Sequence, residues 1–167
     1  MTAVIRARVE DHIDLARHLV WEFFDVLRAR YPEMLAEIDY YIEHQNVAGE
    51  LENFPDYFLP PHGECFLAIK DDIPVGLVML KPHGDGDGEM NRMYVRASAR
   101  GQGIGRALGE ALVAEARALG YGVLWLDALH RHVEALPLYE SLGFTRYTDP
   151  NAFGGDDARI IHMKMTL

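Results

Sequence analysis

Three glycines at alternate positions carry the strongest chemical signal in the sequence. They lie in the run RGQGIGR over residues 100–106, where the pattern of a strand gives way to the pattern of a helix. Glycine lets backbone N–H groups approach a ligand closely, and a helix start adds unpaired N–H donors and the positive end of its dipole. Arg92, Arg96, Arg100 and Arg106 surround this turn in a chain of net charge −10. The turn therefore predicts an anion site suited to phosphate.

Two common phosphate-binding motifs do not fit this turn. A dinucleotide site has the spacing G-x-G-x-x-G and an acidic residue about 20 residues later, a position that Asp127 would fill. The spacing fails because Arg106 or Leu108 stands at the last glycine position, depending on whether the motif starts at Gly101 or Gly103. A P-loop fails as well, because no Gly-Lys-Ser/Thr ending follows.

The turn belongs to a β-loop-α-β unit that would position its N–H groups. Runs of apolar residues predict strands over 89–95 and 122–127, and helical periodicity predicts a helix over 104–119 between them. The remaining C-terminal elements are expected to be a helix over 132–142 and strands over 144–148 and 159–165.

The N-terminal half predicts helices followed by a hairpin. Apolar residues recur at helical spacing over 11–29, and Pro32 suits the start of a second helix. The periodicity is lost over 46–61, which is therefore expected to be a loop. Strands are expected over residues 4–9, 63–70 and 74–81, the last two pairing as an antiparallel hairpin.

Length and composition predict a single globular domain over residues 1–167, with 49% hydrophobic and 25% charged residues. No signal-type N-terminus or membrane-length apolar run is visible, so we expect a cytoplasmic protein without membrane contact. The net charge of −10 disfavours nucleic acid and favours a cationic or amine partner. Cys65 lies in an apolar run and is expected in the core.

Three motifs in order along the chain resemble the GNAT family of N-acetyltransferases. The glycine turn matches the pattern Gln/Arg-x-x-Gly-x-Gly/Ala, with MNRMYV over residues 90–95 before it and ALPLYESLGF over residues 135–144 after it. The resemblance covers roughly residues 89–147. It implies a mixed α/β fold in three layers, with helices on both faces of a mostly antiparallel sheet that splays between its fourth and fifth strands.

The resemblance also implies an activity, the direct transfer of an acetyl group from acetyl-coenzyme A to an amine of a small molecule, a peptide or a protein terminus. The pantetheine arm of the cofactor would lie in the gap of the sheet, and the glycine turn would hold the pyrophosphate. His132 stands where many members have asparagine. The residues expected to contact acetyl-coenzyme A are Met93, Tyr94, Val95, Arg100, Gly101, Gln102, Gly103, Ile104, Gly105, Arg106 and His132.

Acetylation of an amine sets three chemical tasks. A lysine-like amine has a pKa near about 10.4, so a base must take its proton at neutral pH. Glu89 is the first candidate, directly or through water, and Asp127 is the second. Tyr139 stands at the family's usual position for the proton donor to the leaving thiolate. A backbone N–H near Tyr94 or Val95 would stabilise the oxyanion.

Other interpretations stay open at this stage. The chain would also suit a non-catalytic sensor of acyl-coenzyme A with the same fold, and a dinucleotide-dependent oxidoreductase is a more distant alternative. Homodimers are common among related proteins, although no interface is indicated. The acceptor pocket is expected among aromatic residues, several of which would also pack in the core. These are Tyr40, Tyr41, Phe54, Tyr57 and Phe58.

No metal site is predicted. His130 and His132 lie close together, but no cluster of further ligands accompanies them. The run GDGDG over residues 84–88 resembles the start of a calcium loop. Counted from Asp85 as the first position, however, the twelfth position is Arg96, where such a loop needs glutamate. We therefore expect a glycine turn at residues 84–88.

Overall fold

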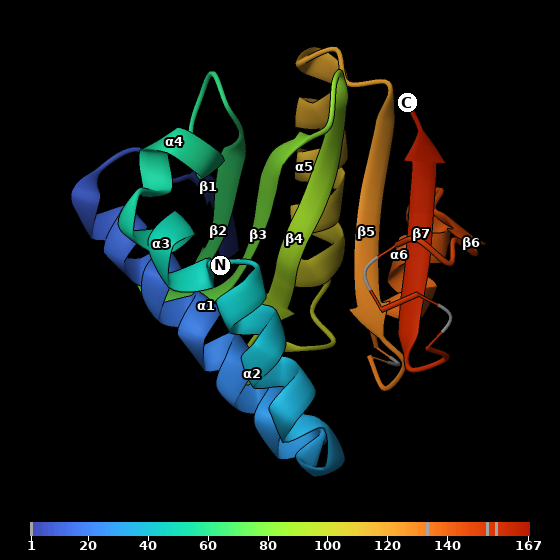
Figure 1. The fold of residues 1–167 in the computed structure, drawn as a ribbon. Helices are drawn as coiled ribbons and strands as arrows, with labels where there is room; N and C mark the ends of the chain where they lie inside the picture. Colours follow the sequence, from blue (N-terminus) through green and yellow to red (C-terminus); the bar gives the residue numbers. More distant parts are fainter. Residues whose placement is uncertain (1, 133, 153, 156) are drawn as a thin grey trace.

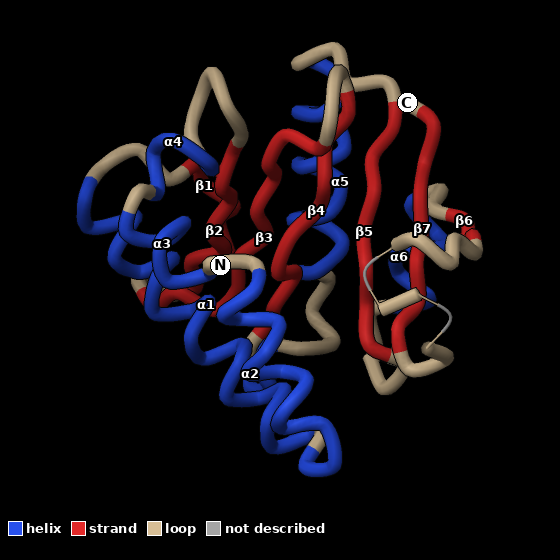
Figure 2. The backbone as a smooth tube through the Cα atoms, viewed as in Figure 1, coloured by secondary structure: helices blue, strands red, loops and turns tan. Residues whose placement is uncertain are grey.

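The computed structural model describes residues 2–132, 134–152, 154–155 and 157–167, and its centre is one seven-stranded sheet (Figures 1 and 2). The strands are β1 (Thr2–Arg6), β2 (Glu64–Lys70), β3 (Ile73–His83), β4 (Asp87–Val95), β5 (Val123–Leu129), β6 (Thr145–Tyr147) and β7 (Ile160–Thr166). Their order is β1-β2-β3-β4-β5-β7-β6, in which β4 and β5 are parallel and all other neighbours antiparallel.

Helices cover both faces of the sheet, as Figure 1 shows, and this confirms the predicted three-layer arrangement. One layer holds α1 (Glu10–Arg30), α2 (Leu35–His44), α3 (Val47–Glu52) and α4 (Phe54–Phe58), with a 3-10 turn at Pro32–Met34 before α2. The other layer holds α5 (Ile104–Ala118) and α6 (Leu136–Leu142), and a second 3-10 turn, Ala97–Ala99, precedes α5.

Alternation along the strands divides the core into two clusters. On β2, Cys65 and Leu67 pack toward the layer of α1, whereas Phe66 and Ala68 pack toward α5. Successive side chains of a strand point to opposite faces, so a strand covered on both sides reads as a continuous apolar run. Cys65 is fully buried, which confirms its predicted place in the core.

The sheet separates between β4 and β5. Only two residue pairs join these strands, Gly88 with Leu124 and Glu89 with Trp125, and both lie at the start of β4. Beyond them the ribbons of β4 and β5 diverge (Figure 1). The gap predicted between the fourth and fifth strands is thereby confirmed, and it leaves backbone groups of the second half of β4 without a neighbouring strand on that side.

Two expectations about helices need correction. Residues 46–61 contain the short helices α3 and α4, whose buried pairs Val47 with Leu51 and Phe54 with Phe58 are four residues apart. Each helix is only about one turn and a half long, too short to show a periodic pattern.

The helix expected over 132–142 begins only at Leu136, in part because Pro137 prefers the first turn of a helix. Of the expected range, residue 133 lies outside the described residues.

No helix in the described part of the chain has the length and apolar character needed to cross a membrane.

Candidate active site

A bulge in β4 decides which way its side chains point. Tyr94 pairs with Leu77 and Asn91 with Met79, so β4 has one residue more than β3 between these pairs. Arg92 lies within the bulge and has a φ of 53°, in the left-handed region. Such a bulge re-aims side chains. As a result, the neighbours Asn91 and Arg92 both reach the face covered by α1.

A first cavity, of about 220 Å³, lies at the N-terminus of α5 beside the end of β4. All the residues that the sequence assigned to acetyl-coenzyme A line it, except Gln102. Arg30 at the end of α1 and Glu134 before α6 complete its wall, paired with each other at 2.8 Å. Sequence reasoning missed Arg30, because nothing local ties a helix end to a turn that comes 70 residues later.

The glycine turn leaves a row of backbone donors unpaired beside this cavity. Gly101 and Gly103 have φ values of 75° and 78°, which L-residues with a side chain rarely adopt. In the described structure, the N–H groups of residues 101–106 have no hydrogen-bond partner, and the first such bond at the helix start runs from the N–H of Ala107 to the carbonyl of Gly103 at 3.0 Å. These N–H groups and the helix dipole can hold an anion.

The arginines around the turn are more dispersed than the sequence suggested. Arg100 Nε donates to the carbonyl of Val95 at 3.0 Å, and Arg106 Nη2 donates to Ser141 Oγ at 2.8 Å, so both stay beside the cavity. Arg96 instead pairs with Glu22 at 2.8 Å. Arg92 lies in the other cavity, described next. The anion site therefore depends mainly on the backbone and on Arg100 and Arg106.

Gln102 and Gly105 have different structural roles in the turn. Gln102 accepts a hydrogen bond from Lys70 Nζ at 2.6 Å, so its side chain is directed to the turn between β2 and β3, and only its backbone N–H is left for a ligand. A Cβ added at Gly105 would lie 3.2 Å from Leu138 Cδ2. Gly105 thus lets α5 and α6 approach closely.

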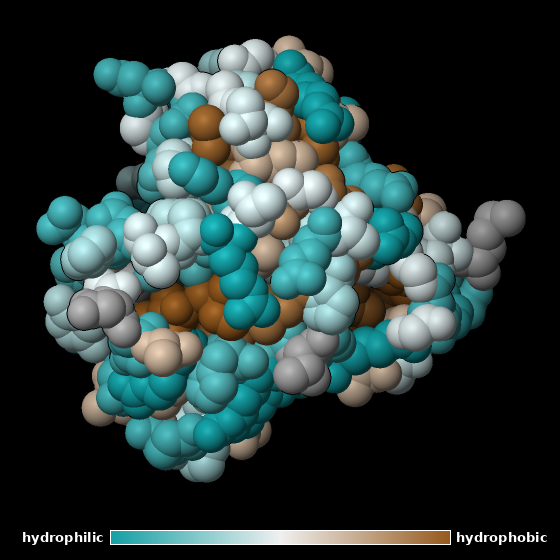
Figure 3. All heavy atoms as spheres, turned by 90° about the vertical axis from the view of Figure 1, so that its right-hand side faces the viewer, coloured by the Kyte–Doolittle hydropathy of each residue, from teal (hydrophilic) through white to brown (hydrophobic). Residues whose placement is uncertain are grey.

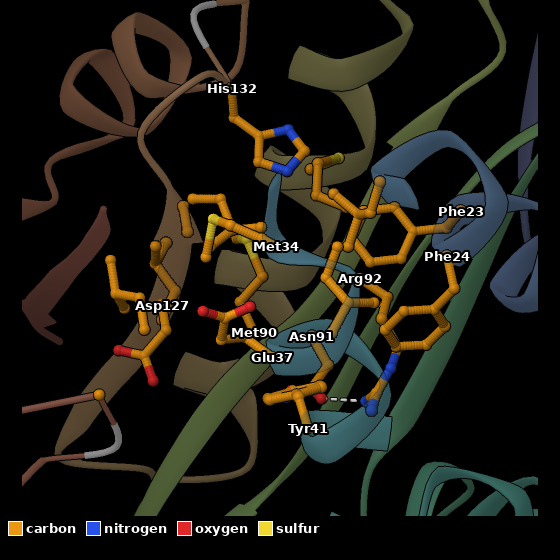
Figure 4. A pocket seen from close by; sticks show the side chains of 18 of the residues that line it. Phe23, Phe24, Met34, Glu37, Tyr41, Met90, Asn91, Arg92, Asp127 and His132 are labelled. Carbon is orange, nitrogen blue, oxygen red and sulfur yellow. Dashed lines mark hydrogen bonds between the residues drawn. The ribbon is translucent and has the colours of Figure 1, made fainter. Parts of the chain in front are cut away.

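A second cavity, of about 330 Å³, lies between α1, α2 and the diverging strands β4 and β5. Most of its lining is apolar, and Figure 3 shows hydrophobic residues exposed in a hollow between hydrophilic rims. Phe23, Met93 and His132 line both cavities, so the two meet there. Figure 4 shows His132 at one end of the second cavity and Asn91, Arg92 and Tyr41 at the other.

The aromatic residues expected around an acceptor divide into two groups. Tyr40 and Tyr41 line the second cavity. Phe54 and Phe58 are buried in the core of the α1 layer, and Tyr57 is exposed. Phe23 and Phe24 of α1 are lining residues that sequence reasoning took only for an apolar helix face.

Glu89 lines the second cavity. It is the last residue of β4 that pairs with β5, so it lies where the gap between the two strands opens. Burial by itself would raise its pKa, but a contact with His83 and the charge of Lys81 outweigh burial and hold the pKa below its usual value. His83 Nδ1 lies 3.6 Å from Glu89 Oε2, and this carboxylate raises the pKa of His83 in turn. Glu89 is therefore ionised at neutral pH, as a base must be.

Asp127 lines the same cavity from β5. Its Oδ1 is 2.6 Å from His162 Nδ1, and His162 is its register partner on β7. Burial raises the pKa of Asp127, although the hydrogen bond from His162 opposes the shift. Because one of its oxygens is already bound to His162, Asp127 is placed less well than Glu89 to take a proton from an amine.

Tyr139 of α6 reaches the second cavity through the gap in the sheet. Its ring packs edge-on against Phe144, and burial raises the pKa of its hydroxyl well above the usual value near about 10. The hydroxyl therefore stays protonated. It forms no hydrogen bond with the described residues and is not sealed inside the protein. Tyr139 can thus donate to a group that enters from the gap.

His132 stands where the two cavities meet. Its ring stacks on Phe23, with 6.1 Å between centroids and 14° between planes. Burial, helped by the positive charge of Arg30, lowers the pKa of His132 to about 4. The ring is therefore neutral at physiological pH. Among the described residues, no group of three or more His, Cys, Asp or Glu side chains could hold a metal.

Comparison with known proteins decides the family. A model described as the acetyltransferase (GNAT) family matches residues 15–144. The chain belongs to the GNAT family. The resemblance to this family that the sequence indicated is thereby confirmed.

Individual GNAT relatives agree with this assignment. The chain is 36% identical over 138 residues to an uncharacterised N-acetyltransferase of Schizosaccharomyces pombe, covering 81% of this chain and 83% of the relative. It is 33% identical over 129 residues to the N-acetylaspartate synthetase of Homo sapiens, covering 71% of this chain and 43% of that protein. The chain therefore spans less than half the length of the synthetase.

Solved GNAT structures share the fold over the whole chain. A GNAT acetyltransferase of Staphylococcus aureus superposes with a TM-score of 0.77 at 16% identity, covering 100% of this chain and 99% of that one. The PaiA N-acetyltransferase of Thermoplasma acidophilum, solved in complex with coenzyme A, gives a TM-score of 0.72 at 14% identity, with coverage of 100% and 99%. Family and relatives together make this protein an acetyl-coenzyme A-dependent N-acetyltransferase.

Proposed function

We propose that this GNAT enzyme acetylates the amine of a small molecule held in the second cavity, with Glu89 as the base and Tyr139 as hydrogen-bond donor to the departing thiolate. The observation that carries the proposal is the junction of the cavities. The cavity at the glycine turn suits the cofactor, and it meets, at Phe23, Met93 and His132, a cavity that contains both Glu89 and Tyr139.

The size of the second cavity and the names of two relatives support a small acceptor. About 330 Å³ is at the lower end of the range for small-molecule sites. N-acetylaspartate synthetase is, by its name, an enzyme that forms an acetylated amino acid. The mycothiol acetyltransferase of Thermomonospora curvata, 40% identical over 82 residues, is likewise named for a small molecule. We therefore favour a small amine over a protein terminus.

In the proposed reaction the ammonium form of the acceptor passes a proton through Glu89, directly or through one water molecule, to solvent, because a carboxylate with a lowered pKa does not keep a proton at neutral pH. The lone pair of the amine then attacks the carbonyl carbon of the thioester, and the carbonyl oxygen becomes an oxyanion. The N–H of Arg96 bonds to Val75 of β3, and N–H directions alternate along a strand, so the N–H of Val95 is turned toward the gap. We assign this N–H to the oxyanion.

The intermediate then collapses as the C–S bond breaks, the thiolate of coenzyme A leaves, and the nitrogen, positively charged since the attack, gives its extra proton to solvent to leave the neutral amide. A thiol has a pKa near about 8.5, far below that of the buried Tyr139 hydroxyl, so full proton transfer from Tyr139 would be uphill. Tyr139 is better suited to stabilise the thiolate by a hydrogen bond, while the proton that converts the thiolate to a thiol comes from solvent.

The cytoplasmic location and the homodimer expected from the sequence stay predictions.

The test combines acetyl-coenzyme A binding by calorimetry with a thiol-release assay over small amines and peptide N-termini. Glu89→Gln should lower kcat/KM by about 100-fold or more, as loss of a general base does. Tyr139→Phe should lower kcat roughly 10- to 100-fold, the value of a hydrogen bond to a charged group. Both variants should bind acetyl-coenzyme A normally, because neither residue lines the cofactor cavity.

Tyr57→Phe is the matched control, since Tyr57 is exposed and lies outside both cavities. It should behave as the wild type does. Unchanged kinetics in Glu89→Gln and Tyr139→Phe would refute the assigned roles. Faster acetylation of peptide N-termini than of every small amine would refute the small acceptor.

A further inference from the structure

Arg92 places a buried positive charge in the wall of the acceptor cavity. The residue is 8% exposed, and its guanidinium lies 5.8 Å from the centroid of the Phe24 ring. The bulge in β4 directs it to this face together with Asn91, which is 4% exposed. Figure 4 shows the two side chains side by side, with Arg92 Nη1 bonded to Asn91 Oδ1.

The donors of this pair are mostly unused. Within the described structure, Arg92 Nε and Asn91 Nδ2 have no hydrogen-bond partner. Arg92 Nη2 also forms no hydrogen bond with described residues. Unlike Nε, it is accessible from outside the protein. A guanidinium stays charged at any physiological pH, and a buried charge is costly unless an opposite charge compensates it.

Among the described residues, the carboxylates that line the cavity do not compensate Arg92. Glu89 and Arg92 interact electrostatically, but they do not form an ion pair. Each lining carboxylate has a basic partner of its own. The pairs are Glu37 with Arg159 at 3.5 Å, Asp157 with Arg159 at 2.7 Å, Asp127 with His162 at 2.6 Å and Glu89 with His83 at 3.6 Å.

We propose that the acceptor is an amino acid whose carboxylate binds Arg92 and Asn91 while its amine faces Glu89. This inference rests on the proposed function and specifies its substrate class. Glu89, Asn91 and Arg92 belong to the same strand and line the same cavity, so one small molecule can reach both ends. A guanidinium binds a carboxylate through parallel N–H donors, and the amide of Asn91 can add one more after a small side-chain rotation.

The proposal revises an expectation drawn from composition. A net charge of −10 favours cationic partners for the protein as a whole. Inside the cavity, the local balance is set by which charges have partners. Among the described lining residues, Arg92 is the cation without a carboxylate partner, so a zwitterionic amino acid matches the site better than a simple amine.

The test measures kcat and KM for matched acceptors with saturating acetyl-coenzyme A. For each of several amino acids, the series contains the free amino acid, its carboxamide, the amine without a carboxyl group, and a dipeptide that begins with the same residue. The free amino acid should exceed its carboxamide by roughly 10- to 100-fold in kcat/KM, as expected for hydrogen bonds to a charged group. The dipeptide, whose carboxylate lies farther from the amine, should be a poorer acceptor.

Arg92→Gln should remove this preference, because it should raise KM for the amino acid much more than KM for its carboxamide. Arg92→Lys keeps the charge and should recover part of the preference, which a purely structural role of Arg92 would not explain. Arg117→Gln is the control, because Arg117 is an exposed residue in the last turn of α5, away from both cavities. It should keep the full preference.

Two failures can be told apart. If acetyl-coenzyme A binds and carboxamides or simple amines react as well as amino acids in the wild type, the amino acid inference is wrong and the acetyltransferase function stands. If no small amine of any kind is acetylated, the proposed function itself fails. The substrate comparison in the wild type needs no variant, so it decides the question even if Arg92→Gln does not fold. A dipeptide that reacts faster than the free amino acid would also overturn the inference.

Discussion

At the scale of single residues, burial and nearby partners set the protonation states on which the chemistry depends. Glu89 stays ionised because His83 and Lys81 outweigh the effect of burial. Tyr139 stays protonated because burial raises its pKa. Burial, helped by the positive charge of Arg30, lowers the pKa of His132 and keeps its ring neutral at the junction of the cavities. The site therefore presents a carboxylate, a protonated hydroxyl and an uncharged ring at the same pH.

His132 should make the protein less stable in mild acid. Its pKa falls from 6.5 to about 4 on folding, so between these values the unfolded chain binds more protons and stability decreases as pH falls. The loss for this residue is at most about 2 kcal/mol by pH 5. His132→Asn should remove it. Urea unfolding at pH 7 and pH 5 measures the free energy of unfolding of both proteins, and an equal loss in both would contradict the prediction.

At the scale of elements, the junction of β4 with α5 builds the anion site from backbone. Gly101 and Gly103 have positive φ angles, and the N–H groups of residues 101–106 have no hydrogen-bond partner in the described structure, at a turn that lies beside one cavity. The bulge in β4 acts on the other cavity, which Asn91 and Arg92 line. Two local departures from regular structure thus shape the walls of the two cavities.

Gly103→Asp should weaken acetyl-coenzyme A binding by more than about 10-fold, because it adds a negative charge where the anion binds and strains a left-handed residue. Gly86→Asp is the matched control. Gly86 has a φ of 81° against 78° for Gly103, and a Cβ at either position meets nothing within 4 Å. Both variants should lose about 1 kcal/mol of stability from strain. Calorimetric titration with acetyl-coenzyme A should show weakened binding by Gly103→Asp and normal binding by Gly86→Asp. Equal binding by both variants would refute the anion site.

At the scale of the whole molecule, the two parts of the sheet are joined weakly in the plane of the sheet. Two residue pairs connect β4 to β5, and further connections run through the helices on both faces, including the pairs Arg30 with Glu134 and Glu37 with Arg159. A cofactor in the gap would contact both parts at once. Binding energy of this kind stabilises the folded state without changing the fold.

Acetyl-coenzyme A should therefore raise the melting temperature of the protein. Removing it by dialysis should return the melting temperature to its original value. At a concentration 100 times its Kd, the gain is about 2.7 kcal/mol. Hydrogen exchange should slow at residues 93–95 and 104–106, which line the cofactor cavity, and change little at β6, which does not. Protection confined to β6, or no shift in melting temperature, would contradict a cofactor in the gap.

Local patterns in the sequence determined the family, the activity and most elements. The glycine turn, the MNRMYV strand and the helix around Tyr139 are contiguous motifs, so the chemistry of each could be inferred without tertiary contacts. α3 and α4 could not be found in this way, because each is too short for helical periodicity to show. The sequence thus indicated where the cofactor binds more clearly than what it acetylates.

Tertiary structure alone decided the acceptor cavity. Arg92 looked like part of the anion turn because it is close to it along the chain, and only the bulge, with a φ of 53° at this residue, turns it into the other cavity. Arg30, Phe23 and Tyr41 reach the site from helices distant in sequence. A motif depends on the spacing of residues along the chain, which can be read from the sequence. The charge balance of a cavity depends on which side chains form ion pairs and hydrogen bonds in the folded structure.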